Sequence, residues 1–530
     1  MLSRIKSYKQ TTNIATAINN YKLAKIYNDS RPVMTIESHN LFNYIYIIIA
    51  ALAYILLHTH LNIYYEDDSW TISNAYTYIK KGLDHDLIFL DQDGGAITTQ
   101  FFGKIFFTTI GHILDIIGWT KANVYLLNSI FILTSVYVWS HIMKLLPVSE
   151  TIQKLVPLMM LIAPSMFFAA HTGRPDAFTF LLLSCGFFSL IRRQHILAGM
   201  IGVLAMETHL MGVVTFFYYL GYLLYLLDDQ VESVSSKNYI IVLKQEIFPI
   251  IVKIIIGSIL GAMIYAGLHW TEFDFSALNN LVVENKDLVS PINNYILSYF
   301  FDFDWSYHLP ELALLIASIV LFLKHRIYKE NRFMTIMLAV LVISTVITRR
   351  ENRNYFIYVL PILLLYYSVI FETLRKERLL SAIMIVTSVF YFSCIYFNNK
   401  DYNFESLSNF ISHKTEQSIP LVGMPDIWFV AKDSEYYPIH NQRDFNKITL
   451  DKFYLIETDY LSARSRVYTD VKENIYTNYN TEVIDSWISD GDHVANIVLC
   501  TKNKADRIFI NYKPYPGWQT VVKNYLFASI

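Results

Sequence analysis

The stretch that decides the fold runs from residue 41 to residue 70 and reads LFNYIYIIIAALAYILLHTHLNIYYEDDSW. Its first part, 41–57, is an apolar run long enough to cross the hydrocarbon core of a bilayer as a helix. Three adjacent acids, Glu66, Asp67 and Asp68, follow shortly afterwards. The stretch therefore predicts a membrane crossing whose exit carries clustered carboxylates.

The composition of the whole chain agrees with a membrane protein. Of 530 residues, 54% are hydrophobic and only 17% are charged, whereas a soluble protein carries nearer a quarter charged residues. The net charge of −2 gives no sign of a nucleic-acid partner. Three cysteines without a CxxC pair indicate neither a disulfide framework nor a structural zinc site.

Further apolar runs predict about eleven crossings in all, and hence an α-helical polytopic membrane protein. The stretch 195–227 is too long for a single crossing, so a break is expected near Met206–Gly212. After 41–57, the predicted spans are 121–143, 155–170, 176–191, 196–207, 209–227, 247–268, 311–324, 332–348, 355–371 and 379–397.

Basic residues predict the orientation of these spans. The 1–40 leader carries six Lys or Arg against two acids, which places it in the cytoplasm. Alternation then puts five basic loops on the cytoplasmic side, as the positive-inside rule requires. One outer loop breaks the rule, because Arg349, Arg350 and Arg353 should not lie there on charge grounds alone. The basic inner loops are 144–154, 192–193, 237–244, 324–332 and 375–378.

The chain divides into three parts at this level. The leader covers 1–40, the membrane region 41–397, and a more polar tail 398–530. In the tail, short β-rich runs alternate with polar segments, which predicts a small mixed α/β domain outside the membrane. Those runs are Leu421–Val422, Phe453–Ile456, Ile497–Cys500 and Arg507–Asn511.

The first outer loop is expected to hold two interfacial helices. One begins at the acids and ends before Gly82, and the other covers about 97–117 and stops at Gly118. Both are too short or too polar to span, so they should lie at the membrane surface. The acids at the start of the first helix either cap it or, as a cluster, raise the pKa of one member and supply a general base.

The second outer loop is the short sequence Thr172-Gly173-Arg174-Pro175-Asp176, directly between two spans. It is either a tight turn capped by an Arg–Asp pair or a functional site, since charge at a membrane boundary is usually functional.

The acidic cluster after the first span, the two interfacial helices and the Gly-Arg-Pro-Asp loop resemble the GT-C glycosyltransferases. The closest resemblance is to the branch of protein O-mannosyltransferases and the lipid A aminoarabinose transferase. Arg353-Asn354-Tyr355, followed by Pro361, resembles the Arg-Tyr…Pro signature of that branch. One departure is Asp93-Gly94-Gly95, where many relatives have a Pro-Pro pair. The resemblance covers roughly 40–370.

The resemblance implies that a sugar is transferred from a polyprenyl-phosphate carrier to a hydroxyl group, with inversion, on the outer face of the membrane. It assigns the base to Asp67, with Asp68 as its neighbour, and a catalytic acid to Asp176. The departing phosphate needs positive charge, for which the candidates are Arg349, Arg350, Arg353 and Arg174.

Four further side chains are candidates for the substrate cavity: Glu66, Glu207, His209 and Tyr355. Glu207 and His209 lie in an apolar stretch, where they serve either a cavity or a structural hydrogen bond. No cofactor is expected to be required, although the acids could hold a divalent metal.

The expected partners are the polyprenyl-phosphate sugar, membrane lipids, and an acceptor that could be a glycolipid, a lipid-linked glycan or a protein. The expected location is a bacterial plasma membrane. Two alternatives remain open: an O-antigen polymerase or ligase, and a transporter. A polymerase would not need the acids after the first span, and a transporter would show repeated or broken spans in two halves.

Overall fold

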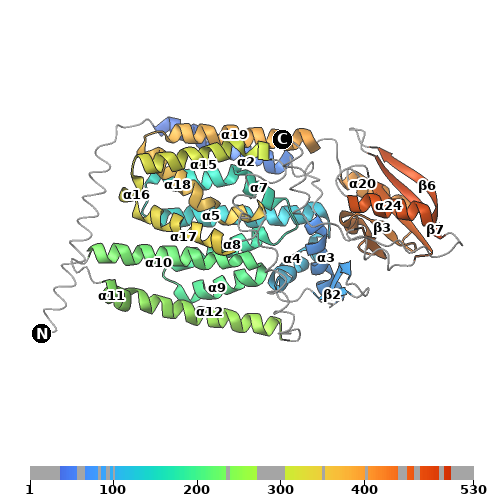
Figure 1. Ribbon diagram of the computed structural model, residues 1–530, viewed down its shortest axis with the longest axis horizontal. Coiled ribbons are helices and arrows are strands. Elements are labelled where there is room, and N and C mark those ends of the chain that lie inside the picture. The colour runs from blue at the N-terminus through green and yellow to red at the C-terminus, as the bar shows by residue number, and fades with distance from the viewer. Residues whose placement is uncertain are drawn as a thin grey trace.

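The computed structural model describes residues 36–56, 66–81, 85–90, 96–98, 102–233, 239–270, 305–348, 353–399, 404–439, 450–458, 466–488 and 494–502. Long helices lie side by side in a bundle, and a C-terminal sheet lies beyond one end of it (Figure 1). The two short helices of the first outer loop, α3 (Glu66–Lys81) and α4 (Lys104–Ile117), lie at that same end.

Every apolar run predicted to cross the membrane coincides with a helix or a pair of helices. By length and composition, four of the described helices could span a membrane, or five if a bent pair counts as one. The number of crossings therefore stays a prediction. The bundle helices are α2 (Ile36–Leu56), α5 (Lys121–Leu145), α6 (Glu150–Ile162), α7 (Pro164–Ala170), α8 (Asp176–Ile191), α9 (His195–Thr208), α10 (Val214–Ser233), α12 (Phe248–Leu268), α15 (Trp305–Lys324), α17 (Arg332–Thr348), α18 (Leu360–Thr373) and α19 (Glu377–Asn399).

The break predicted near Met206–Gly212 is present. Helix α9 ends at Thr208, the 3₁₀ turn η1 covers Leu210–Val213, and α10 begins at Val214. Gly212 allows the turn to close, because a Cβ there would lie 2.1 Å from the carbonyl oxygen of Ala205. This turn separates Glu207 from the helix that follows.

The run 155–170 is not the single helix that was expected. It forms the end of α6 and the short α7, with a bend of 52° between them. The cause is Pro164, which has no N–H to continue α6 and holds Ala163 in an extended conformation with ψ 128°. The bend delivers the second outer loop to the end of the bundle where α3 lies.

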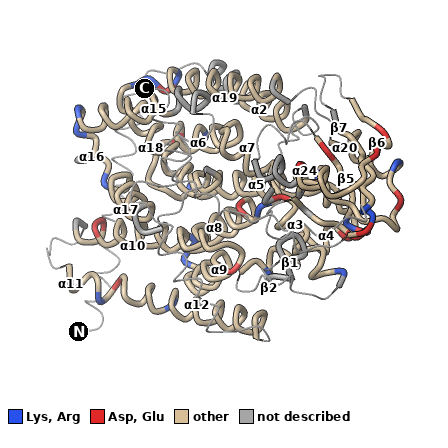
Figure 2. Tube along the Cα trace, turned by 45° about the vertical axis from the view of Figure 1, so that its right-hand side comes forward, with Lys and Arg blue, Asp and Glu red and all other residues tan. Residues whose placement is uncertain are grey.

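Short elements complete the opposite end of the bundle. They are α11 (Tyr239–Val242), the π-helical turn η2 (Leu243–Ile247) and α16 (Ile327–Glu330). Basic residues mark this end near α16, away from the C-terminal sheet (Figure 2). Arg193, Arg326 and Arg375 each adopt the left-handed conformation, with φ between 54° and 63°, just after a helix. A cation at a helix C-terminus interacts favourably with the helix dipole.

The first outer loop differs from the expectation in its second half. Helix α3 covers Glu66–Lys81 as predicted, but α4 covers only Lys104–Ile117. Strands β1 (His85–Leu90) and β2 (Ala96–Thr98) pair antiparallel where the second helix was expected to begin. Helix α4 begins directly after Gly103, because the φ of 98° at Gly103 is left-handed and cannot belong to a right-handed helix. Gly118, with φ 103°, ends the helix as expected.

The tail forms the predicted mixed α/β domain, with a five-stranded sheet in the order β4-β3-β5-β7-β6. Strand β3 is parallel to β4 and β5, and β7 is antiparallel to β5 and β6. Three of the four predicted runs lie in β3, β5 and β7, and 507–511 lies outside the described residues. The elements are α20 (Phe404–Lys414), β3 (Leu421–Gly423), η4 (Pro425–Ile427), α21 (Trp428–Ala431), β4 (Tyr436–Pro438), β5 (Lys452–Thr458), α24 (Arg466–Asn478), β6 (Tyr479–Ile488) and β7 (Val494–Lys502).

Candidate active site

The second outer loop joins α7 to α8, and a side chain of α5 forms hydrogen bonds with its backbone. The side-chain amide of Asn128 donates to the carbonyl of Thr172 and, at 3.4 Å, to that of Arg174. A buried amide on a helix thus satisfies the carbonyl groups of a turn that would otherwise be left without partners. These hydrogen bonds join the loop to α5 at the end of the bundle.

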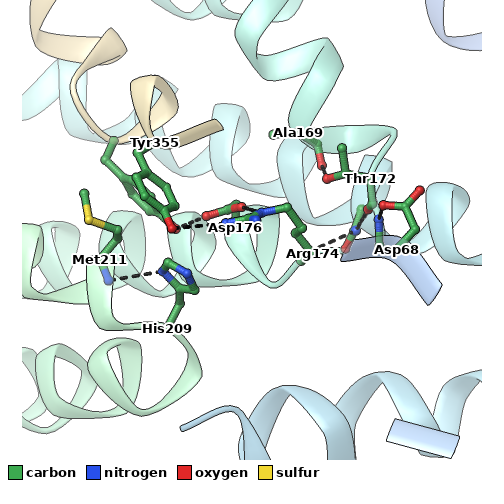
Figure 3. Close-up of polar contacts among 11 residues, drawn as sticks. Asp68, Ala169, Thr172, Arg174, Asp176, His209, Met211 and Tyr355 are labelled. Carbon is green, nitrogen blue, oxygen red and sulfur yellow. Dashed lines mark hydrogen bonds and ion pairs between the residues drawn. The ribbon is translucent and has the colours of Figure 1, made fainter. Parts of the chain in front are cut away.

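Asp68 connects the first outer loop to the second (Figure 3). Its side chain is fully buried. Oδ1 accepts a hydrogen bond from the backbone N–H of Gly173, and Oδ2 accepts one from the hydroxyl of Tyr125 at 2.7 Å. A Cβ on Gly173 would lie 2.7 Å from the Cα of Asp68, so only glycine permits this approach. Asp68, the last acid of the cluster, therefore lies directly against the Gly-Arg-Pro-Asp loop.

Two charged residues that the sequence analysis did not select lie beside Asp68. Nζ of Lys121 is 2.9 Å from Oδ2 of Asp426 and 3.9 Å from Oδ2 of Asp68. Burial raises the pKa of Asp68 to about 7. The positive charge of Lys121 lowers this pKa, and the negative charge of Asp426 raises it. A signal for Lys121 was present, because it is a basic residue at the outer end of a predicted span. Asp426 gave no local signal.

Arg174 and Asp176 form a buried ion pair, which also contacts two tyrosines (Figure 3). Nε of Arg174 is 2.7 Å from Oδ2 of Asp176, and its NH2 group donates to the hydroxyl of Tyr355 at 3.2 Å. The hydroxyl of Tyr358 donates to Oδ1 of Asp176 at 2.9 Å. Tyr358 was not predicted. It follows Tyr355 by three residues in the 3₁₀ turn η3 (Arg353–Tyr358), where side chains three apart lie on the same side.

The structure separates the two members of the Glu207–His209 pair. The ring of His209 lies 5.3 Å from that of Tyr355, next to the Arg174–Asp176 pair, and its Nδ1 accepts from the N–H of Met211 (Figure 3). Glu207 instead accepts hydrogen bonds from the backbone N–H of Lys104 at 2.7 Å and of Ile105 at 3.2 Å. Nε2 of His269 lies 3.1 Å from the same carboxylate. Glu207 therefore makes the hydrogen bonds of a cap on α4, and its role in a substrate cavity stays a prediction.

Several predicted residues are placed only in part. Glu66 and Asp67 are the first two residues of α3, but their side chains lie outside the described residues. Arg353 begins η3, and its side chain also lies outside them, as do Arg349 and Arg350 altogether. Among the residues that are described, no group of three or more His, Cys, Asp or Glu could hold a metal ion.

Comparison with known proteins gives a structural match alone. No family model matches the sequence, and no curated protein matches it. Among solved structures, ArnT from Cupriavidus metallidurans bound to undecaprenyl phosphate matches 86% of this chain and 97% of its own, with a TM-score of 0.55 at 12% identity. The chain has the ArnT fold.

The fold shared with ArnT supports the GT-C resemblance drawn from the sequence motifs. The apo structure of the same ArnT matches 85% of this chain and 97% of its own, with a TM-score of 0.49 at 10% identity. The prediction of a mostly helical fold with several apolar helices is thus confirmed, and the fold resembles that of ArnT.

Proposed function

We propose that this protein is a membrane glycosyltransferase that moves a sugar from a polyprenyl-phosphate carrier to a hydroxyl acceptor on the outer face of the membrane. The shared fold with ArnT, whose crystal structure holds undecaprenyl phosphate, supports this donor class. The observation that carries the proposal is the contact of Asp68 with Gly173, which joins the start of α3 to the loop that holds the Arg174–Asp176 pair. An acid–arginine site at one end of the bundle suits a displacement at a phosphate-linked carbon.

The proposed reaction is a single displacement. The acceptor hydroxyl loses its proton to Asp67 as its oxygen bonds to the anomeric carbon. The bond from that carbon to the phosphate oxygen breaks on the opposite side, and the polyprenyl phosphate leaves with the electron pair. The configuration of the anomeric carbon is inverted.

Asp67 is preferred to Asp68 as the base because of what Asp68 already binds. Both carboxylate oxygens of Asp68 accept hydrogen bonds, from Gly173 and from Tyr125. That arrangement suits a residue that holds the two loops together. Asp67 precedes it in the first turn of α3 and shares its position at the end of the bundle.

We assign to the outer-loop arginines the stabilisation of the negative charge that develops on the departing phosphate. Arg349, Arg350 and Arg353 precede or begin η3, the turn that supplies Tyr355 and Tyr358 to the Arg174–Asp176 pair. Arg174 is a further candidate, because its guanidinium has five N–H donors in a fixed fork. Asp176 would hold Arg174 in orientation.

We further propose that the protein lies in a bacterial plasma membrane with its N-terminus in the cytoplasm and its C-terminal domain outside. The acceptor class is left open between a glycolipid, a lipid-linked glycan and a protein. The reaction as written needs no cofactor, and activity measured with and without a chelator tests whether a divalent metal contributes.

The test is release of polyprenyl phosphate by purified protein from a panel of polyprenyl-phosphate sugars, with a membrane extract supplying acceptors. Asp67→Asn is expected to lose activity by about 100-fold or more, the range for removal of a general base. Asp115→Asn is the matched control, since Asp115 lies in the same outer loop on α4 and pairs with Lys80 and Trp119 at the surface.

Each result has a defined meaning. Loss in Asp67→Asn with retention in Asp115→Asn supports both the donor class and the base. Full activity of Asp67→Asn would keep the donor class and reject Asp67 as the base. Absence of release from every donor by the unmodified protein would overturn the proposed transferase.

A further inference from the structure

The C-terminal domain docks on the first outer loop through η4 and α21. The ring of Tyr76, on α3, lies 5.0 Å from that of Trp119 and 5.6 Å from that of Trp428, with both pairs edge to face. Its hydroxyl donates to Oδ1 of Asp433 at 2.6 Å. The domain is therefore held against the helix that carries Asp67 and Asp68.

Three charged side chains from three different elements come together where the domain meets α3. Asp68 comes from α3, Lys121 is the first residue of α5, and Asp426 lies in η4 of the C-terminal domain. Their residues are 0%, 4% and 3% exposed, respectively. The ring of Phe404, from α20, lies 5.3 Å from Nζ of Lys121 and helps to enclose it. One buried lysine thus forms ion pairs with two buried carboxylates.

A buried ionic cluster is a poor source of stability, because desolvation of the charges offsets much of their attraction. Hydrophobic side chains of similar size in the same place often give equal or greater stability. The cluster is instead placed to orient one carboxylate. Lys121 and Tyr125, one turn apart on α5, both approach Oδ2 of Asp68, which leaves Oδ1 directed at the N–H of Gly173.

We propose that Lys121, held in place by Asp426, is a positioning residue for Asp68, and that the C-terminal domain thereby completes the transferase site. The inference rests on the proposed function of that site. Lys121 acts through Asp68 on the Gly173 loop, and through that loop on Arg174. The C-terminal domain contributes a charge to the site rather than a cover for it.

The two partners of Asp68 have opposite electrostatic effects on it. Lys121 lowers the pKa of Asp68 and Asp426 raises it, although burial is the largest influence. Tyr125 and the N–H of Gly173 favour the ionised form. Among the described residues, two further titratable groups lie next to the partners of Asp68. The ring of His171 lies 5.8 Å from that of Tyr125, and Tyr436 lies near Asp426.

The experiment measures thermal stability against pH, from about pH 4 to pH 9, for Lys121→Met and Asp426→Asn in the full-length protein. Because burial raises the pKa of Asp68 from 3.8 to about 7, its stabilising contribution is present at low pH and is lost as the pH rises through the folded-state pKa. Subtracting the curve of Asp68→Asn isolates this contribution.

We expect the loss of stability to move to higher pH in Lys121→Met and to lower pH in Asp426→Asn, each by about one pH unit. Tyr76→Phe is the matched control, because it removes a polar contact between the domain and α3 that lies outside the cluster. Its overall stability is expected to fall, but the pH at which the Asp68 contribution is lost should match that of the unmodified protein. Polyprenyl-phosphate release, measured in parallel, should fall in both cluster variants and recover in Lys121→Arg.

Shifts in the same direction, no shift in either variant, or an equal shift in Tyr76→Phe would overturn the proposal. Should Lys121→Met fail to fold, Asp426→Asn must still shift downward and Lys121→Arg must match the unmodified protein, or the proposal fails. The stability curves need no donor. Failure of the transferase function would therefore appear as absent release by the unmodified protein, separately from the pH shifts.

Discussion

At the scale of single residues, the site depends on how closely two outer loops approach. The backbone of Gly173 lies against that of Asp68, and the N–H of Gly173 is bound by the Asp68 carboxylate. Backbone atoms cannot move aside as the end of a flexible side chain can. The position of Arg174, the next residue, therefore depends on the absence of a side chain at position 173.

Gly173→Ala tests this dependence. A Cβ at position 173 would lie 2.7 Å from Cα and 2.8 Å from the carbonyl oxygen of Asp68, which forces the loops apart. We expect polyprenyl-phosphate release to fall by about 100-fold, as for other misplacements of about 1 Å in an active site.

Gly221→Ala is the control for that measurement. Its Cβ would meet Sδ of Met337 at 2.7 Å, the end of a flexible side chain that can move. Activity should be close to that of the unmodified protein. Equal activity of Gly173→Ala and Gly221→Ala would show that the contact between the loops is unimportant for the reaction.

At the scale of elements, Glu207 fixes the start of the second interfacial helix. Its carboxylate accepts from the first N–H groups of α4, and the N–H of Gly103 donates to its backbone carbonyl at 2.5 Å. A carboxylate at a helix N-terminus satisfies unpaired donors and interacts favourably with the dipole. Helices α9 and α4 are thereby joined at the outer end of the bundle.

Glu207→Gln should lower stability by about 1–3 kcal/mol, the cost of leaving buried donors incompletely satisfied. The measurement is the thermal unfolding midpoint in detergent. Glu150→Gln is the matched control, because Glu150 is exposed and forms a surface ion pair with Lys154, one turn along α6. A midpoint unchanged in Glu207→Gln would contradict the capping role.

The crossing of α9 and α12 depends on small residues. A Cβ on Gly257 would lie 1.9 Å from the carbonyl oxygen of Ile196, and one on Gly199 would lie 2.0 Å from that of Ile254. Gly257 and Gly261 are four residues apart on one face of α12, the spacing that lets membrane helices approach closely.

Gly257→Ala is therefore expected to separate these helices and to destabilise the protein by about 1–3 kcal/mol, as overpacking does. Gly267→Ala, on the same helix, is the control, because a Cβ there would meet nothing within 4 Å. The unfolding midpoints of the two variants are compared directly. Similar midpoints would mean that α12 does not depend on the close contact.

At the scale of the whole molecule, the polar site and the C-terminal sheet lie at one end of the bundle, and basic turns lie at the other (Figures 1 and 2). The left-handed arginines that follow helices α8, α15 and α18 are all in loops predicted to be cytoplasmic. Under the positive-inside rule, this arrangement supports the proposal that the site lies on the outer face.

This orientation can be measured by labelling single cysteines in intact cells with a membrane-impermeant maleimide, after replacement of Cys185, Cys394 and Cys500. Ser412→Cys, on exposed α20, should react in intact cells. His325→Cys, exposed between α15 and α16, should react only after permeabilisation. The reverse pattern would place the site in the cytoplasm and contradict the proposed orientation.

The sequence by itself determined which segments are apolar helices, where 195–227 breaks, and which two outer loops carry acids and arginine. These features follow from hydropathy and turn chemistry, which act between residues close together in the chain. The same reasoning missed the β1–β2 hairpin, because an amphipathic pattern does not show where a helix must begin.

Only the tertiary structure decided how the side chains pair. Lys121 and Asp426 are 305 residues apart, and Glu207 caps a helix that begins 103 residues earlier in the chain. Arg174 and Tyr355 come together across 181 residues. Such pairs are chosen by the packing of whole helices and of the C-terminal domain, since no local pattern distinguishes a charged residue that will find a buried partner from one that will face water.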